Sequence, residues 1–148
     1  MKPKIGVSHL RKGRYSNKGQ IYHCIFSTLN REPIFHQFDL ARMFISILKE
    51  DEIRGLSKTY AYVVMPDHIH WLFQLDKGDL SAAIKRIKSL YAKQSKRKVW
   101  NKGFYDHGIR ADEDLMSTAR YIVANPLRAG LVDKIGDYPH WDCIYLEG

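Results

Sequence analysis

Residues 65–73 read Met-Pro-Asp-His-Ile-His-Trp-Leu-Phe, an apolar and aromatic run that follows a Pro-Asp pair. This composition predicts a buried β-strand that begins after a tight turn. Because successive side chains of a strand point to opposite faces, His68 and His70 are expected side by side on one face. Ile69 and Trp71 point the other way, toward the core. Two neighbouring imidazoles are either half of a metal site or two polar neighbours of a core strand.

The segments on both sides of this strand alternate between patterns typical of strands and of helices. Strands are predicted over 20–28, 58–65 and 103–110, and helices over 37–54, over 80–98 and from an acidic start at 112–114. Asp79 is well placed to cap the second of these helices. The order β-α-β-β-α-β-α matches an α+β fold, in which a ferredoxin-like antiparallel sheet carries one added C-terminal helix.

Length and composition predict one domain. The chain has 148 residues, of which 45% are hydrophobic, enough for a core of its own. Cys24 and Cys143 lie in separate apolar segments, which predicts reduced thiols rather than a disulfide. No apolar run is long enough to span a membrane, and the N-terminus lacks the apolar stretch of a signal peptide. We therefore expect a soluble, cytoplasmic protein without a membrane partner.

Positive charge is concentrated in two segments. The chain has a formal net charge of +8, and residues 1–19 and 80–105 carry many lysines and arginines but no acidic residue. This segregation favours a polyanion such as nucleic acid, because basic side chains that neutralise phosphates release counterions. The alternative is a solvated helix face and a basic tail without a partner. Tyr15, Tyr91 and Trp100 lie in these segments, where they either stack on bases or pack in the core.

One tyrosine of the third predicted helix lies off its apolar stripe. The stripe comprises Leu115, Ala119, Ile122 and Val123. Tyr121 shares the polar face with Asp114 and Thr118, and Asn125 lies one turn further on. Tyr121 is either an ordinary surface residue or a nucleophile, because a phenolate can attack phosphorus beside a divalent cation that orients the phosphate.

Two segments together resemble a known family. His68-Ile69-His70 and Tyr121-Ile122-Val123-Ala124-Asn125-Pro126-Leu127-Arg128-Ala129-Gly130-Leu131 resemble the single-tyrosine HUH transposases, and within them the REP-associated tyrosine transposases. The resemblance runs from the first strand to Leu131. It implies a basic N-terminal arm over 1–19, a transposase domain over 20–130 and a tail over 131–148 that packs on the domain.

The resemblance also implies a reaction. His68 and His70 would bind Mg²⁺ or Mn²⁺, and Tyr121 would attack single-stranded DNA to form a 5′-phosphotyrosine and a free 3′-hydroxyl. Asn125, one turn after the tyrosine, would complete the metal site. Because Pro126 biases Asn125 away from helical geometry, the carboxamide either reaches the metal from the helix end or caps the helix and leaves the third position to water.

The family recognises a DNA hairpin with a short guide sequence, so basic side chains are assigned to DNA by region and charge. The candidates in the arm are Arg11, Lys12, Arg14 and Tyr15. The candidates for the hairpin backbone lie on the exposed sides of the second helix and are Lys85, Arg86, Lys88 and Lys93. His107 and Arg110 either hold the scissile phosphate or are ordinary strand-end residues. The resemblance favours a monomer over a dimer. The alternative functions are a non-catalytic regulator that binds hairpins and a hydrolase that uses water as its nucleophile.

Overall fold

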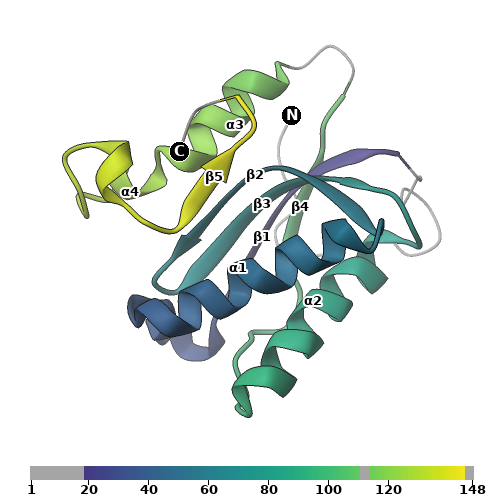
Figure 1. Cartoon of the computed structure of the whole chain (residues 1–148), viewed down its shortest axis with the longest axis horizontal. Helices are drawn as coiled ribbons and strands as arrows, with labels where there is room; N and C mark the ends of the chain where they lie inside the picture. The colour runs from purple at the N-terminus through teal and green to yellow at the C-terminus, as the bar shows by residue number, and fades with distance from the viewer. Residues whose placement is uncertain (1–18, 111–113, 146–148) are drawn as a thin grey trace.

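An antiparallel sheet forms the centre of the computed structural model, which describes residues 19–110 and 114–145 (Figure 1). The strands are β1 (Ile21–Ser27), β2 (Ser57–Met65), β3 (His68–Leu75), β4 (Tyr105–Gly108) and β5 (Trp141–Cys143). Their order across the sheet is β4-β1-β3-β2-β5, and every neighbouring pair is antiparallel. The first four strands have the ferredoxin-like order, so the predicted α+β fold is confirmed.

The helices lie on both faces of the sheet. They are α1 (Phe38–Ile53), α2 (Leu80–Ser95), α3 (Leu115–Val123) and α4 (Asn125–Arg128). In Figure 1, α1 and α2 cover one face together, whereas α3 and α4 lie over the other face beside β5. The helix that carries Tyr121 is therefore on the opposite side of the sheet from the basic helix α2.

Each face of the sheet has its own hydrophobic core. Under α1 and α2, the fully buried side chains include Ile69 and Trp71 of β3, as the strand alternation predicts. Under α3, the buried side chains are Ala61, Val63, Met65, Leu72, Ile109, Ala119, Ile122, Val123 and Cys143. Since the predicted apolar stripe of α3 supplies three of these residues, burial of that stripe fixes the helix on the sheet and turns its polar face outward.

Side chains and backbone geometry define the helix ends. The carboxylate of Asp79 accepts a hydrogen bond from the backbone N–H of Ala82 at 2.7 Å, which confirms the predicted cap of α2. Asp114 caps α3 in the same way, by accepting from the N–H of Ser117 at 3.2 Å. The predicted end of α2 at residue 98 is three residues too late, because Lys96 adopts a left-handed conformation with φ of 57°.

The C-terminal segment adds β5 to the edge of the sheet, where Ala61 of β2 pairs with Cys143. This strand was not predicted from the sequence. Cys24 and Cys143 are both buried free thiols. Within the described ranges, every helix is too short or too polar to cross a membrane.

Candidate functional site

The two histidines of β3 lie together beside the hairpin turn, on the face opposite α1 and α2. Their ring centroids are 5.2 Å apart, and the ring planes are inclined by 65°. His70 is buried with 7% of its surface exposed, whereas the side chain of His68 is 19% exposed. The alternation of the strand predicted this arrangement.

Each ring is held through its Nδ1 atom. Nδ1 of His68 lies 2.8 Å from Oδ1 of Asp67, whose other oxygen accepts a hydrogen bond from Nε of Arg31 at 2.9 Å. Nδ1 of His70 lies 3.0 Å from Nε2 of His23, a residue of β1 that the sequence analysis did not include in the site. Both bonds leave the Nε2 atoms of His68 and His70 for another partner.

Burial keeps the inner imidazoles neutral. Burial is the main cause that lowers the pKa of His70 to about 2, and electrostatic interactions with His23, His68 and Arg128 contribute to the same shift. Burial and the charge of His107 lower the pKa of His23 to about 4. At physiological pH both rings are therefore neutral, which is the state in which an imidazole nitrogen binds a cation.

Tyr121 lies on the exposed side of α3, as predicted. The side chain is 58% exposed, and the guanidinium carbon of Arg128 lies 3.8 Å from the ring centroid. Burial raises the pKa of Tyr105 on β4, and electrostatic interactions with Asp106 and Tyr121 contribute to the same shift. The ring centroid of Tyr105 is 6.5 Å from that of His23, and α3 packs on Val63, Met65 and Leu72, which lie on the sheet face opposite α1 and α2. Tyr121 and the histidine pair therefore belong to one face of the sheet in a single chain.

Asn125 follows α3 and begins α4. Its Nδ2 atom donates a hydrogen bond to the carbonyl oxygen of Ile122 at 2.8 Å, so the carboxamide caps the last turn of α3. Pro126, near the start of α4, accounts for the break between the two helices. Because the bond uses the amide nitrogen, Oδ1 is the atom that a cation would use, and the ligand role of Asn125 stays a prediction.

The donors of this site fit a cation that takes part of its coordination from outside the protein. In the described part of the chain, no group of three or more His, Cys, Asp or Glu side chains is arranged to hold a metal ion. His68 and His70 each offer an Nε2 atom, and the carboxamide of Asn125 is the third candidate. A Mg²⁺ or Mn²⁺ ion held this way needs water or phosphate oxygens to fill its remaining positions.

Two adjoining hollows connect the histidines with α2. The first has a volume of about 520 Å³ and is lined by His68, His70, Arg31 and Lys102 among others. The second, of about 430 Å³, lies along Lys85 of α2. Residues 101–104 line both hollows. A concave surface therefore runs from the histidine pair around the edge of the sheet to the basic helix.

The predicted DNA contacts on α2 divide into two classes. Lys85 and Lys93 are exposed, as predicted. The expectation that Arg86 and Lys88 face solvent is wrong. Arg86 donates from Nε and a terminal nitrogen to Asp51 at 2.7 and 3.0 Å, and Lys88 donates to the carbonyl oxygens of residues 101 and 103 at 3.0 and 2.7 Å. Sequence alone does not reveal these partners, which lie in other elements.

The other predicted DNA contacts lie at the ends of the described ranges. Residues 11, 12, 14 and 15 of the arm lie outside them. His107 pairs with His23 across β1 and β4, and Arg110 is exposed beyond the end of β4. Their phosphate roles stay predictions.

The aromatic residues of the second basic segment serve as packing. Tyr91 is fully buried, and its hydroxyl donates to the carbonyl oxygen of Leu40 at 2.9 Å. Trp100 packs edge-on against Phe26 with the ring centroids 5.3 Å apart, and its Nε1 donates to the carbonyl oxygen of Lys88 at 3.0 Å. Of the two alternatives for these residues, packing in the core is therefore the one observed.

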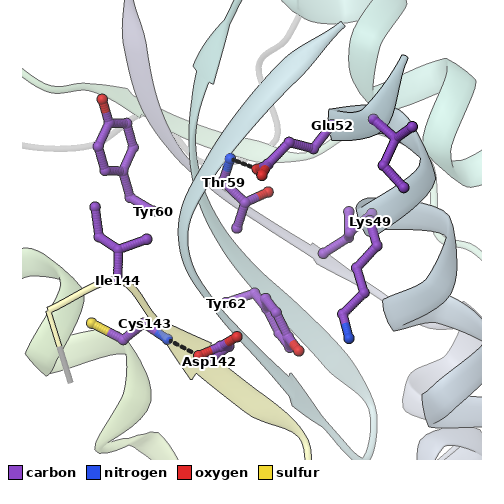
Figure 2. Close-up of a pocket in the computed structure, with 10 residues that line it drawn as sticks. Lys49, Glu52, Thr59, Tyr60, Tyr62, Asp142, Cys143 and Ile144 are labelled. Carbon is purple, nitrogen blue, oxygen red and sulfur yellow. Dashed lines mark hydrogen bonds between the residues drawn. The ribbon is translucent and has the colours of Figure 1, made fainter. Parts of the chain in front are cut away.

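A further hollow, of about 340 Å³, lies between α1, β2 and β5 (Figure 2). Tyr60, Tyr62 and Ile144 are among the residues that line it. At the border of this hollow, the carboxylate of Glu52 accepts a hydrogen bond of 2.6 Å from the backbone N–H of Thr59. The lining includes none of the histidines, so this hollow is separate from the site.

The comparison with known families agrees with this geometry. The family model described as "Transposase IS200 like" matches residues 16–125, about three quarters of the chain. The chain belongs to the IS200-like transposase family. Its fold class and its resemblance to REP-associated tyrosine transposases, both predicted from the sequence, are confirmed.

Two curated proteins and one solved structure are similar to this chain. The REP-associated tyrosine transposase of Escherichia coli is 29% identical over 131 residues, which cover 85% of this chain and 78% of that protein. A Haemophilus influenzae protein assigned to the same group is 31% identical over 100 residues, which cover 56% of this chain and only 57% of its own length. A solved structure of a REP-associated tyrosine transposase bound to a REP hairpin has a TM-score of 0.72 and 28% identity, and covers 86% of this chain and 79% of its own.

Proposed function

We propose that this transposase is a metal-dependent endonuclease and strand transferase that acts on single-stranded DNA at REP-like hairpins through a 5′-phosphotyrosine on Tyr121. The observation that carries the proposal is that the helix of Tyr121 packs on the same face of the sheet that holds His68 and His70, within one chain. The hairpin substrate is suggested by the similar structure that contains a REP hairpin. We further propose that the protein acts in the cytoplasm as a monomer, because one chain carries all the parts.

The chemical step is attack of Oη of Tyr121 on the scissile phosphorus. A bond from phosphorus to Oη forms and the bond to the 3′-oxygen breaks. The phenol loses its proton and the 3′-oxygen gains one, so the products are a 5′-phosphotyrosine and a strand that ends in a 3′-hydroxyl. A divalent cation held by His68, His70 and Asn125 would polarise the phosphate. Attack by another 3′-hydroxyl on the phosphotyrosine reverses the step and joins strands.

Arg128 supports this step from the side of the tyrosine. Its guanidinium lies against the ring of Tyr121, and its charge also acts on His70. The contact holds the ring and brings a positive charge to the place where the phosphate, which is negative, must lie.

The DNA path follows the concave surface from the histidines to α2. Lys102 borders both hollows, and Lys85 and Lys93 are exposed on the helix at the far end of this path. Exposed lysines at these places neutralise backbone phosphates without reading the sequence. We assign the basic arm over 1–19 to the same DNA, as a segment distinct from the domain over 20–130 and the tail over 131–148. His107 and Arg110 remain our candidates for a phosphate near the end of β4.

The proposal is tested with a hairpin-containing single strand in Mg²⁺ or Mn²⁺. A 3′-terminal label should migrate with the denatured protein, whereas a 5′-terminal label should appear on a shorter free strand. Tyr121→Phe and chelation of the metal should each abolish both products and leave DNA binding intact. Tyr105→Phe is the matched control, because it removes a neighbouring phenol and should still form the adduct. Binding without cleavage by the unchanged protein in both metals would instead support the non-catalytic regulator.

A further inference from the structure

We infer that Asp67 and His23 are positioning residues, which hold the two imidazoles of the proposed metal site with Nδ1 engaged and Nε2 turned to the cation. The inference rests on the proposed function, since it concerns how the chain prepares that same site. The two histidines have different partners on different elements, yet both partners contact the same ring atom, Nδ1, at 2.8 and 3.0 Å.

The contact with Asp67 defines the tautomer of His68. The carboxylate is paired with Arg31 at 2.9 Å, and an ionised carboxylate can only accept hydrogen bonds. Nδ1 of His68 must therefore be the donor. In the neutral ring the proton is then on Nδ1, and Nε2 carries the lone pair that a metal requires.

The contact with His23 links the tautomer of His70 to that of His23. One of the two facing nitrogens donates and the other accepts, so two proton arrangements satisfy the bond. Only the arrangement in which His70 donates from Nδ1 leaves its Nε2 with a lone pair. Binding of a cation at Nε2 therefore selects the state in which Nε2 of His23 accepts. The rings are inclined by only 30°, which suits a hydrogen bond near both ring planes.

Rigid elements support both partners. The backbone oxygen of Asp67 accepts hydrogen bonds from the N–H and the hydroxyl of Thr28 at 3.0 and 3.1 Å. His23 lies in the middle of β1, paired with Leu72 on one side and with His107 on the other. The sheet and the turn therefore fix the backbone from which each partner side chain extends. Contacts of this kind orient metal-binding histidines, and their loss typically weakens metal binding by about 10- to 100-fold.

The test is the dissociation constant of Mn²⁺ for the full chain without DNA, measured from the electron paramagnetic resonance signal of free Mn²⁺. His23→Phe keeps the ring volume but cannot accept from His70, so binding should weaken by about 10- to 100-fold. His23→Gln retains an acceptor oxygen and should restore most of the affinity. His140→Phe is the matched control, because His140 is also buried but packs against Phe38 and Tyr138, away from the site. This control should bind like the unchanged protein.

Asp67→Ala tests the second contact at a half-exposed turn position, where the fold is expected to persist, and it should weaken Mn²⁺ binding in the same range. If His68→Ala and His70→Ala lose Mn²⁺ but His23→Phe and Asp67→Ala bind within twofold of the unchanged protein, the inference is wrong and the proposed function stands. If the unchanged protein does not bind Mn²⁺, the inference and the proposed function both fail.

Long-range proton–nitrogen spectra of the metal-free protein give a readout independent of affinity. They should show the proton of the neutral His68 ring on Nδ1, and a neutral ring with its proton on Nε2 would overturn the inference.

Discussion

Replacing Arg86 should destabilise the protein strongly without weakening its electrostatic attraction to DNA. The guanidinium makes two hydrogen bonds to Asp51, whose side chain is only 1% exposed and whose second oxygen also accepts from the hydroxyl of Ser57 at 2.6 Å. These bonds tie α1, α2 and the start of β2 together. Arg86→Met removes the charge partner and leaves a buried carboxylate, a change that typically costs about 3–5 kcal/mol.

For a domain of this size, each kcal/mol lowers the melting temperature by about 2–4 °C, so a fall of roughly 10 °C is expected. Urea unfolding followed by circular dichroism at pH 7 measures the free energy. Lys85→Met, one residue away on the exposed side of α2, is the matched control and should change stability by less than about 0.5 kcal/mol. Adding Asp51→Asn to Arg86→Met should recover part of the loss, because no uncompensated charge then remains buried.

Binding to a DNA hairpin at several salt concentrations separates the two roles. Lys85→Met should flatten the dependence of affinity on salt by just under one unit of slope, whereas Arg86→Met should leave the slope unchanged at a temperature where the variant is folded. If Arg86→Met loses less than about 1 kcal/mol of stability and also flattens the salt dependence, the structural role of Arg86 is refuted and a contact with DNA is supported instead.

Three further predictions concern pH and packing. The free energy of unfolding of the metal-free protein should fall as the pH drops below 6.5, because the unfolded chain takes up protons there while burial lowers the folded pKa of His23 to about 4 and of His70 to about 2. Each histidine should account for roughly 2 kcal/mol at pH 5, measured by urea unfolding. A flat pH profile would contradict the neutral state of the buried rings of His23 and His70. Ile122→Ala removes a fully buried contact of α3 and should cost about 2–5 kcal/mol in the same assay. Tyr91→Phe loses its hydrogen bond to Leu40 and should cost about 1 kcal/mol with unchanged DNA affinity, whereas weaker DNA binding would support base stacking.

Local patterns were sufficient to predict most of the fold. The alternation of 65–73 placed Ile69 and Trp71 in the core, and Asp79 marked the start of α2. The strand β5 was not predicted because it has only three residues, and its hydrogen bonds come from the edge of β2 rather than from a pattern of its own. A strand this short depends on the sheet beside it.

The site could be predicted only where its members share an element or a motif. The pair on β3 and the off-stripe Tyr121 follow from the periods of a strand and a helix. His23 joins the site through the register of β1 on β3, and Arg128 through the turn from α3 to α4, and neither relation is written in local sequence. Charge on α2 was misleading for the same reason, because the partner of Arg86 lies 35 residues away on α1.

The central claim is that Tyr121 is the nucleophile of a site built around the histidine pair. Its most direct test is mass spectrometry of the protein–DNA adduct after nuclease and trypsin digestion, which should isolate the peptide 121–128 between Arg120 and Arg128. The claim predicts a nucleotide attached through its 5′-phosphate to Tyr121, and loss of that species in His68→Ala and His70→Ala. A nucleotide on Tyr105 or another residue, or an adduct that persists in Tyr121→Phe, would contradict it.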